Sequence, residues 1–194
     1  MRLLQNRKGS ISDEKYKYFS PIQNFTDIGY KKIKTPEHVF KMITEFWEAN
    51  KDNESNENWH GGNSFVNYWE NPSKMVSVEN SKLVGGGWEL KSAIWNVTKD
   101  LISAWTGQEL EGSSVYGIRI YKEGAILAPH VDRLPLISSA IINVEQDVDE
   151  EWPLEVFGHD GVARNVTMKP GDMVLYESHS VLHGRCCFIF SCYH

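Results

Sequence analysis

The amino-acid sequence predicts an α+β protein, with a helical N-terminal half followed by a jelly roll or barrel of short strands. Up to about residue 110, apolar residues recur at three- and four-residue steps, the period of a helix with one buried face. From Ser113 onward the pattern changes to alternation and β-branched residues, which is typical of strands. Tight-turn sequences separate these strands, which favours antiparallel architecture over a parallel sheet. We expect the helices to pack outside the sheet through their apolar faces.

Two helices are expected in the first half. The first begins near Thr35, which suits the N-cap, with Pro36 in the first helical position. Its buried face is expected to carry Val39, Ile43, Phe46 and Trp47. The second helix is expected over Glu89 to Leu110, with a buried face of Leu90, Ile94, Val97, Leu101 and Trp105.

The segment between the helices reads as loop and turn. It contains Gly85, Gly86 and Gly87, and no Lys-Ser or Lys-Thr follows them, so a turn is favoured over a phosphate-binding loop. Large aromatic side chains in such a segment usually cover a core. We therefore expect burial of Trp59, Trp69 and Trp88.

Five strands are expected after Ser113. They cover residues 115–121, 137–144, 154–157, 165–168 and 173–176. The sequences His159-Asp160-Gly161 and Lys169-Pro170-Gly171-Asp172 are strong turn signals between them. The chain then divides into a helical and loop region over 1–112, which supports a β-rich region over 113–194, within one structural domain.

Composition limits the classes of partner. With 41% hydrophobic and 24% charged residues, the chain has the composition of a soluble globular protein. Its net charge of −6 gives no general attraction for phosphate, so no nucleic-acid partner is expected. No stretch approaches the ~20 apolar residues that span a bilayer, and no signal peptide precedes the first helix, so we expect a cytoplasmic protein without membrane contact. Nothing in the sequence specifies an oligomeric state.

All three cysteines lie near the C-terminus, at positions 186, 187 and 192. The odd number does not indicate a disulfide scaffold, in agreement with a reducing compartment. Together with His194 they could bind zinc, but the spacing lacks paired CxxC geometry and does not favour it.

The chemistry-bearing pattern is His130-Val131-Asp132. Residues two apart on a strand point to the same face, so an imidazole and a carboxylate would lie side by side. A second imidazole from a distant strand would complete two histidines and one carboxylate, the set that binds non-haem iron(II) and leaves coordination positions open. Both His179 and His183 follow the last expected strand, and we favour His183 because it would begin the next strand.

From about residue 115 to 185 the sequence resembles the catalytic domain of prolyl 4-hydroxylase alpha subunits, which are iron(II)- and 2-oxoglutarate-dependent dioxygenases. The phrases YGIRIYKEGAILAPHVD, KPGDMVLYES and LHGR carry the resemblance. The phrases FTDIGYKKIKTPEHVF, NYWE and GGGWEL resemble the leader of an algal-type subgroup.

This resemblance implies a double-stranded β-helix, a cupin-like jelly roll, with iron held by His130, Asp132 and His183. It implies 2-oxoglutarate as co-substrate, ascorbate as reductant, and hydroxylation of an unactivated C–H bond with succinate and CO2 as co-products. Peptidyl proline, another peptide or a small molecule is the implied substrate. The match also implies that the Tyr121 hydroxyl helps to hold the distal carboxylate of 2-oxoglutarate, although a core tyrosine is an equally good reading.

One departure from the family pattern concerns the cation that pairs with this carboxylate. The family places a Lys or Arg about nine residues beyond the second histidine, where this chain has Cys192. The chain ends at His194, so the resemblance implies an incomplete last strand. Arg185 or Arg119 could substitute for the cation. The alternatives are a catalytically impaired jelly-roll remnant or metal-binding module, and a cupin-like metalloprotein that uses iron without 2-oxoglutarate.

Overall fold

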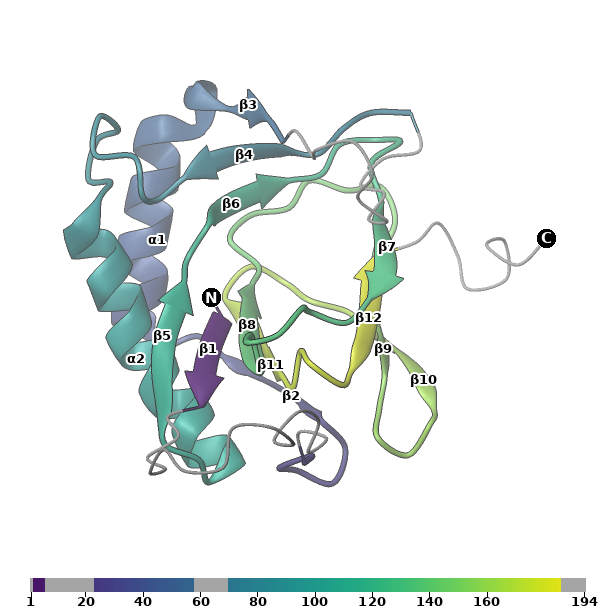
Figure 1. Ribbon diagram of the computed structural model, residues 1–194. Coiled ribbons are helices and arrows are strands. Elements are labelled where there is room, and N and C mark those ends of the chain that lie inside the picture. The colour runs from purple at the N-terminus through teal and green to yellow at the C-terminus, as the bar shows by residue number, and fades with distance from the viewer. Residues whose placement is uncertain (1, 6–22, 58–69, 186–194) are drawn as a thin grey trace, which may run out of the picture.

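The computed structural model describes residues 2–5, 23–57 and 70–185. Figure 1 shows two helices on one side of a β-rich body. The strands form three sheets, and every pairing between the described strands is antiparallel. The mixture of antiparallel sheets with two helices confirms the predicted α+β class.

The largest sheet combines strands from both halves of the chain. Its order is β2 (Tyr30–Lys34), β11 (Asp172–Tyr176), β8 (Ser138–Ile142), β1 (Arg2–Gln5) and β5 (Leu110–Ser114). The N-terminal region, expected to be helix and loop, therefore also contributes strands. The short β2 was missed because its sequence, YKKIK, has only one strongly apolar residue, as suits an exposed sheet edge.

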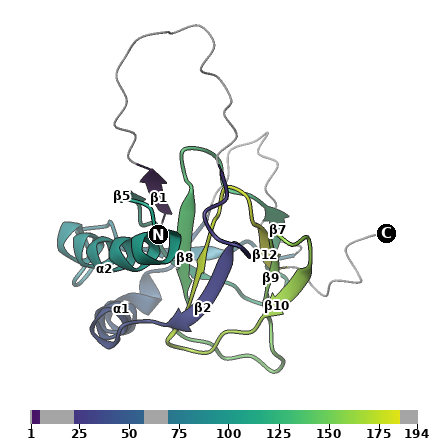
Figure 2. The same cartoon turned by 90° about the horizontal axis from the view of Figure 1, so that it is seen from below.

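A four-stranded sheet faces the largest sheet. Its order is β10 (Ala163–Val166), β9 (Leu154–Phe157), β12 (Leu182–Arg185) and β7 (Leu127–His130). Figure 2 shows the layers in sequence: helices, the sheet with β8 and β2, and then the sheet with β9, β12 and β7. The predicted strand over 154–157 has these bounds, whereas the strand predicted over 165–168 lies at 163–166.

Strand β11 shows why both sheet faces are buried. Met173 and Leu175 pack against helix residue Ile102 in one apolar cluster. The alternate residues Val174 and Tyr176 belong to the cluster between the two sheets. Because successive side chains of a strand point to opposite faces, one five-residue strand contributes to two cores.

Helix α1 (Glu37–Asn50) follows β2 directly. Its N-cap is Pro36 and not the expected Thr35, because Thr35 still belongs to the extended chain and its amide donates to the carbonyl of Gly171 at 2.9 Å. The expected buried face holds for Val39, Ile43 and Phe46, while Trp47 is only partly buried. A short 3-10 helix, η1 (Lys51–Asn53), continues from α1.

Helix α2 (Trp88–Thr106) ends earlier than predicted, because Gly107 adopts the left-handed conformation of a C-cap and Leu110 already belongs to β5. Its buried face is also rotated from the predicted one and consists of Leu90, Ile94, Thr98, Ile102 and Thr106. The threonines can be buried because each hydroxyl donates to the carbonyl four residues earlier. Among the described residues, no helix has both the length and the apolarity to cross a membrane.

The third sheet consists of β3 (Ser55–Asn56), β4 (Lys74–Ser77) and β6 (Gly117–Ile120). The strand predicted over 115–121 is thus found in shorter form as β6, and the strand before it, β5, was not predicted and ends at Ser114. Gly117 allows the change of sheet, since its φ of 155° and its approach to the Val76 carbonyl leave no room for a side chain.

The prediction of a buried Trp88 is wrong. Its side chain is 71% exposed and its ring packs edge-on against Trp95, because Gly87 starts α2 with Trp88 on the outer side of its first turn. Trp59 and Trp69 lie outside the described residues.

Candidate metal centre

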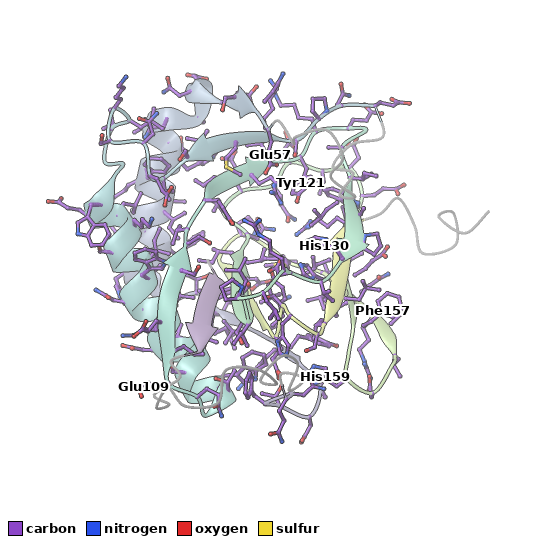
Figure 3. The ribbon with its side chains drawn as sticks, in the orientation of Figure 1. Glu57, Glu109, Tyr121, His130, Phe157 and His159 are labelled. Carbon is purple, nitrogen blue, oxygen red and sulfur yellow. The ribbon has the colours of Figure 1, made fainter. Side chains whose placement is uncertain are left out.

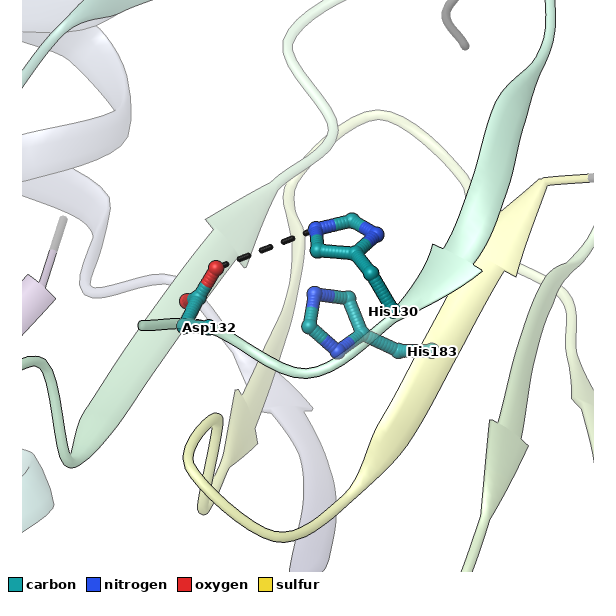
Figure 4. A group of neighbouring side chains, drawn as sticks. All are labelled: His130, Asp132 and His183. Atoms are coloured by element: carbon teal, nitrogen blue, oxygen red, sulfur yellow. Dashed lines mark ion pairs between the residues drawn. The ribbon is translucent and has the colours of Figure 1, made fainter. Parts of the chain in front are cut away.

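Two neighbouring strands bring His130 and His183 together. Strands β7 and β12 pair antiparallel, and His183 lies opposite His130 in their register. Their ring centroids are 4.4 Å apart. Figure 4 shows the rings approaching each other from the two strands. A separation of 53 residues in the sequence thus becomes a direct contact across one sheet.

Asp132 completes the group from the segment that follows β7. One carboxylate oxygen of Asp132 is 3.8 Å from Nε2 of His130 (Figure 4). One potential ligand atom from each of His130, Asp132 and His183 lies within 4.8 Å of the other two. Asp132 and His183 are buried, with 5% and 2% exposure, and His130 is partly buried. Three ligands of this kind suit a divalent transition metal that keeps further coordination positions open.

The tautomer of each histidine follows from a contact with the main chain two residues earlier. Nδ1 of His130 is 2.8 Å from the carbonyl oxygen of Ala128, and Nδ1 of His183 is 2.9 Å from that of Val181. A carbonyl only accepts, so each Nδ1 must carry the proton for these contacts to be hydrogen bonds. Nε2 then carries the lone pair, which is the form of imidazole that binds a metal.

The competing residue, His179, lies elsewhere. Its Nδ1 is 2.9 Å from the carbonyl oxygen of Ile137, and its ring packs against Phe25. The sequence argument that preferred the strand-borne histidine therefore agrees with the geometry, since His183 and not His179 lies with His130 and Asp132.

A cavity of about 500 Å3 opens beside the two histidines of the group. Its lining includes His130, His183, Tyr121, Arg119, Trp152 and Arg185. Figure 3 labels Tyr121 and His130, which belong to different parts of the β-rich body and approach the same interior space. Both residues that were expected to hold 2-oxoglutarate, Tyr121 and Arg185, therefore border the same cavity as the histidines.

Arg185 is held mainly by aromatic rings. Its guanidinium lies 5.2 Å from the Trp152 ring and 5.9 Å from the Tyr121 ring, and it donates to the Trp152 carbonyl at 3.1 Å. Burial lowers the pKa of Arg185, and none of the described carboxylates forms an ion pair with it. A partly buried cation of this kind can accept an anion from solution, because removing a charge from water without a counter-charge is costly.

The other candidate cation, Arg119, already has a partner. Its guanidinium forms a hydrogen-bonded ion pair with Glu57, whose second carboxylate oxygen accepts a hydrogen bond from Ser73 at 2.7 Å. The charge of Arg119 is therefore balanced within the protein. Cys192, at the position where the family has its cation, lies outside the described residues, as do the other cysteines, His194 and the expected last strand.

The sequence reasoning missed several residues of the site. Tyr176 packs against His183 with ring centroids 4.6 Å apart and ring planes tilted by 59°. Trp152 packs edge-on against Tyr121, and Ser139 donates to Asp132. Ser139 carried a usable signal, because Ser138-Ser139 is a polar pair inside an otherwise apolar strand. Trp152 carried none, since it follows a run of acidic residues that reads as an exposed loop.

Comparison with known proteins supports the fold of this chain but does not show its family. No protein-family model and no curated protein sequence matches this chain. Among solved structures, a prolyl-4-hydroxylase from Pseudomonas putida is similar with a TM-score of 0.53 and 15% sequence identity, covering 81% of this chain and 84% of that one. At this identity the likeness shows a shared fold, so this chain has a prolyl-4-hydroxylase-like fold.

Proposed function

We propose that this protein is an iron(II)- and 2-oxoglutarate-dependent oxygenase that hydroxylates an unactivated C–H bond. The observation that carries the proposal is the group of His130, Asp132 and His183, whose histidines border a cavity that is also lined by Arg185, a cation with which no described carboxylate forms an ion pair. We further propose that the two facing sheets form a double-stranded β-helix. The similarity in fold to a prolyl-4-hydroxylase supports both statements.

The donor set fits iron(II). His130 and His183 each offer Nε2 in the tautomer that their backbone contacts require, and Asp132 offers one carboxylate oxygen. Two imidazoles and one carboxylate with open positions are the ligands of non-haem iron(II) oxygenases. Bound iron and 2-oxoglutarate would together supply the oxidative chemistry, with succinate and CO2 as co-products.

The remaining residues of the cavity would bind and orient 2-oxoglutarate and the substrate. In this proposal Arg185 pairs with the distal carboxylate of 2-oxoglutarate, and the Tyr121 hydroxyl donates a second hydrogen bond. Trp152 and Tyr176 exclude water from the carboxylate and from the metal, which strengthens both interactions. A C–H bond of a peptide, with peptidyl proline as one candidate, or of a small molecule would enter from the rest of the cavity.

Two measurements test the proposal. Anaerobic addition of iron(II) and then 2-oxoglutarate should produce a visible charge-transfer absorption, because the keto acid chelates the metal. With oxygen and ascorbate, the protein should release succinate, and Asp132→Ala should abolish both signals. Metal binding without either signal would favour the alternative of a metal-binding module that lacks productive 2-oxoglutarate binding.

A further inference from the structure

The two carboxylate oxygens of Asp132 have different surroundings. Oδ1 is the oxygen 3.8 Å from Nε2 of His130 and so faces the metal centre. Oδ2 instead lies 3.2 Å from the hydroxyl of Ser139 on β8. A carboxylate that is fixed in this way offers one oxygen to a metal, whereas a freely rotating one could offer either or both.

A second buried serine, Ser178, contacts the hydroxyl of Ser139. The hydroxyl oxygens of Ser139 and Ser178 are 2.8 Å apart, and these residues are 1% and 0% exposed. Ser139 has one hydroxyl proton, and the ionised Asp132 can only accept. The arrangement that satisfies all three groups has Ser139 donating to Asp132 while Ser178 donates to Ser139.

Ser178 also holds the backbone of the same ligand. The amide of Asp132 donates to the Ser178 carbonyl at 2.6 Å. Ser178 is itself fixed by its neighbour Glu177, whose buried carboxylate accepts hydrogen bonds from the amides of Phe25 and Thr26, both at 2.8 Å. Ser178 therefore fixes Asp132 in two ways. It holds the main chain of Asp132 directly, and it holds the side chain through Ser139.

We infer that Ser139 is a positioning residue for the metal ligand Asp132, and that Ser178 acts through it. The pair sets which carboxylate oxygen faces the two histidines and removes the cost of ordering that oxygen when a metal binds. This inference rests on the metal centre of the proposed function and is independent of 2-oxoglutarate. Hydrogen-bonding partners of metal ligands typically change metal affinity by roughly 10- to 100-fold.

The test is Mn2+ affinity, measured by the electron paramagnetic resonance signal of free Mn2+ in a titration of the metal-free protein. Ser139→Ala should weaken binding by roughly 10- to 100-fold, and Ser139→Thr, which keeps the hydroxyl, should restore most of it. Ser178→Ala should cause a smaller loss. The double variant should bind no more weakly than Ser139→Ala alone, because Ser178 acts through Ser139.

The matched control is Ser138→Ala. Ser138 is the preceding residue of β8 and is equally buried, and its hydroxyl has no hydrogen-bond partner among the described residues. This variant should keep wild-type Mn2+ affinity. Thermal unfolding of each metal-free variant identifies any that fails to fold. If Ser139→Ala does not fold, Ser178→Ala becomes the test. Weaker Mn2+ binding in this variant supports the inference, and wild-type Mn2+ affinity contradicts it.

Three results would overturn the inference. The first is wild-type Mn2+ affinity in folded Ser139→Ala, the second is additive losses in the double variant, and the third is a wild-type protein that binds no Mn2+. By contrast, Mn2+ binding that depends on Ser139 in a protein without succinate release would leave the inference standing and contradict the proposed oxygenase activity.

Discussion

Each histidine of the metal centre is oriented by the main chain that directly precedes it. In both cases Nδ1 meets the carbonyl oxygen of the residue two positions earlier, Ala128 for His130 and Val181 for His183. Ala128 belongs to β7 and Val181 immediately precedes β12, so the main chain just before each histidine orients its ring. The same local geometry on two paired strands presents two similar nitrogen donors to one point.

Substitution of Arg185 tests whether this residue binds the distal carboxylate of 2-oxoglutarate. Arg185→Met keeps an apolar stem against Trp152 and Tyr121 but removes the charge. A hydrogen bond to a charged group contributes about 1.5–3 kcal/mol, so the affinity of the metal-loaded protein for 2-oxoglutarate should fall by roughly 10- to 150-fold. An anaerobic titration of the iron(II) protein with 2-oxoglutarate measures this loss.

Lys122→Met is the control for this prediction. Lys122 borders the same cavity, but it is half exposed and pairs with Glu54 at 3.0 Å. Its removal should leave 2-oxoglutarate affinity unchanged. Equal losses in the two variants would indicate a general effect of cavity charge, and an unchanged affinity in Arg185→Met would exclude Arg185 as the carboxylate partner.

At the scale of elements, Asp172 ties β11 to the edge strand β2. Its buried carboxylate forms ion pairs with Lys32 and Lys34, and it accepts a hydrogen bond from the amide of Lys169 at 2.9 Å. The hydrogen bond from Lys34 is the largest of the influences that lower the pKa of Asp172 well below its usual range. The carboxylate thus closes the turn before β11 and holds β2 in register with it.

Asp172→Asn should lower the free energy of unfolding by about 1–2 kcal/mol at pH 7, since it removes one buried acceptor charge and two partly exposed ion pairs. A depressed pKa in the folded state means that this contribution is present at neutral pH and is lost as the pH falls below the unfolded value of about 3.9. Urea unfolding at pH 7 and near pH 3 should therefore show a difference between wild type and variant that shrinks with acidification. A difference that is independent of pH would contradict the assignment.

At the scale of the whole molecule, the metal centre joins the two sheets. His130 and His183 lie on strands of the four-stranded sheet, while Asp132 lies in the connection to β8 and is hydrogen-bonded to Ser139 of the five-stranded sheet. A metal ion bound to all three would cross-link the layers. Folding and metal binding should accordingly be coupled.

Metal should therefore raise the thermal stability of the folded chain. At a free Mn2+ concentration of about 100 times Kd, binding adds roughly 2.7 kcal/mol, which corresponds to an increase in Tm of about 5–10 °C for a chain of this size. Differential scanning calorimetry with and without Mn2+ measures the shift. His130→Ala should abolish it, and the same shift in that variant would mean that the metal binds elsewhere.

The sequence by itself determined the change from helix to strand near residue 110, the five strands predicted after Ser113 and the three residues of the candidate metal centre. Hydrophobic periodicity and the His-x-Asp pair each involve residues that are close together in the sequence. The local pattern was therefore enough to predict these strands and two of the three ligands. Only the tertiary structure decided that β1 and β2 join the main sheet, that Thr98 replaces Val97 on the buried face of α2, and that Arg119, and not Arg185, forms an ion pair with one of the described carboxylates. These features depend on partners that lie far away in the sequence. The surroundings of a side chain, and not its type, determine whether its hydrogen bonds and charge are satisfied when it is buried.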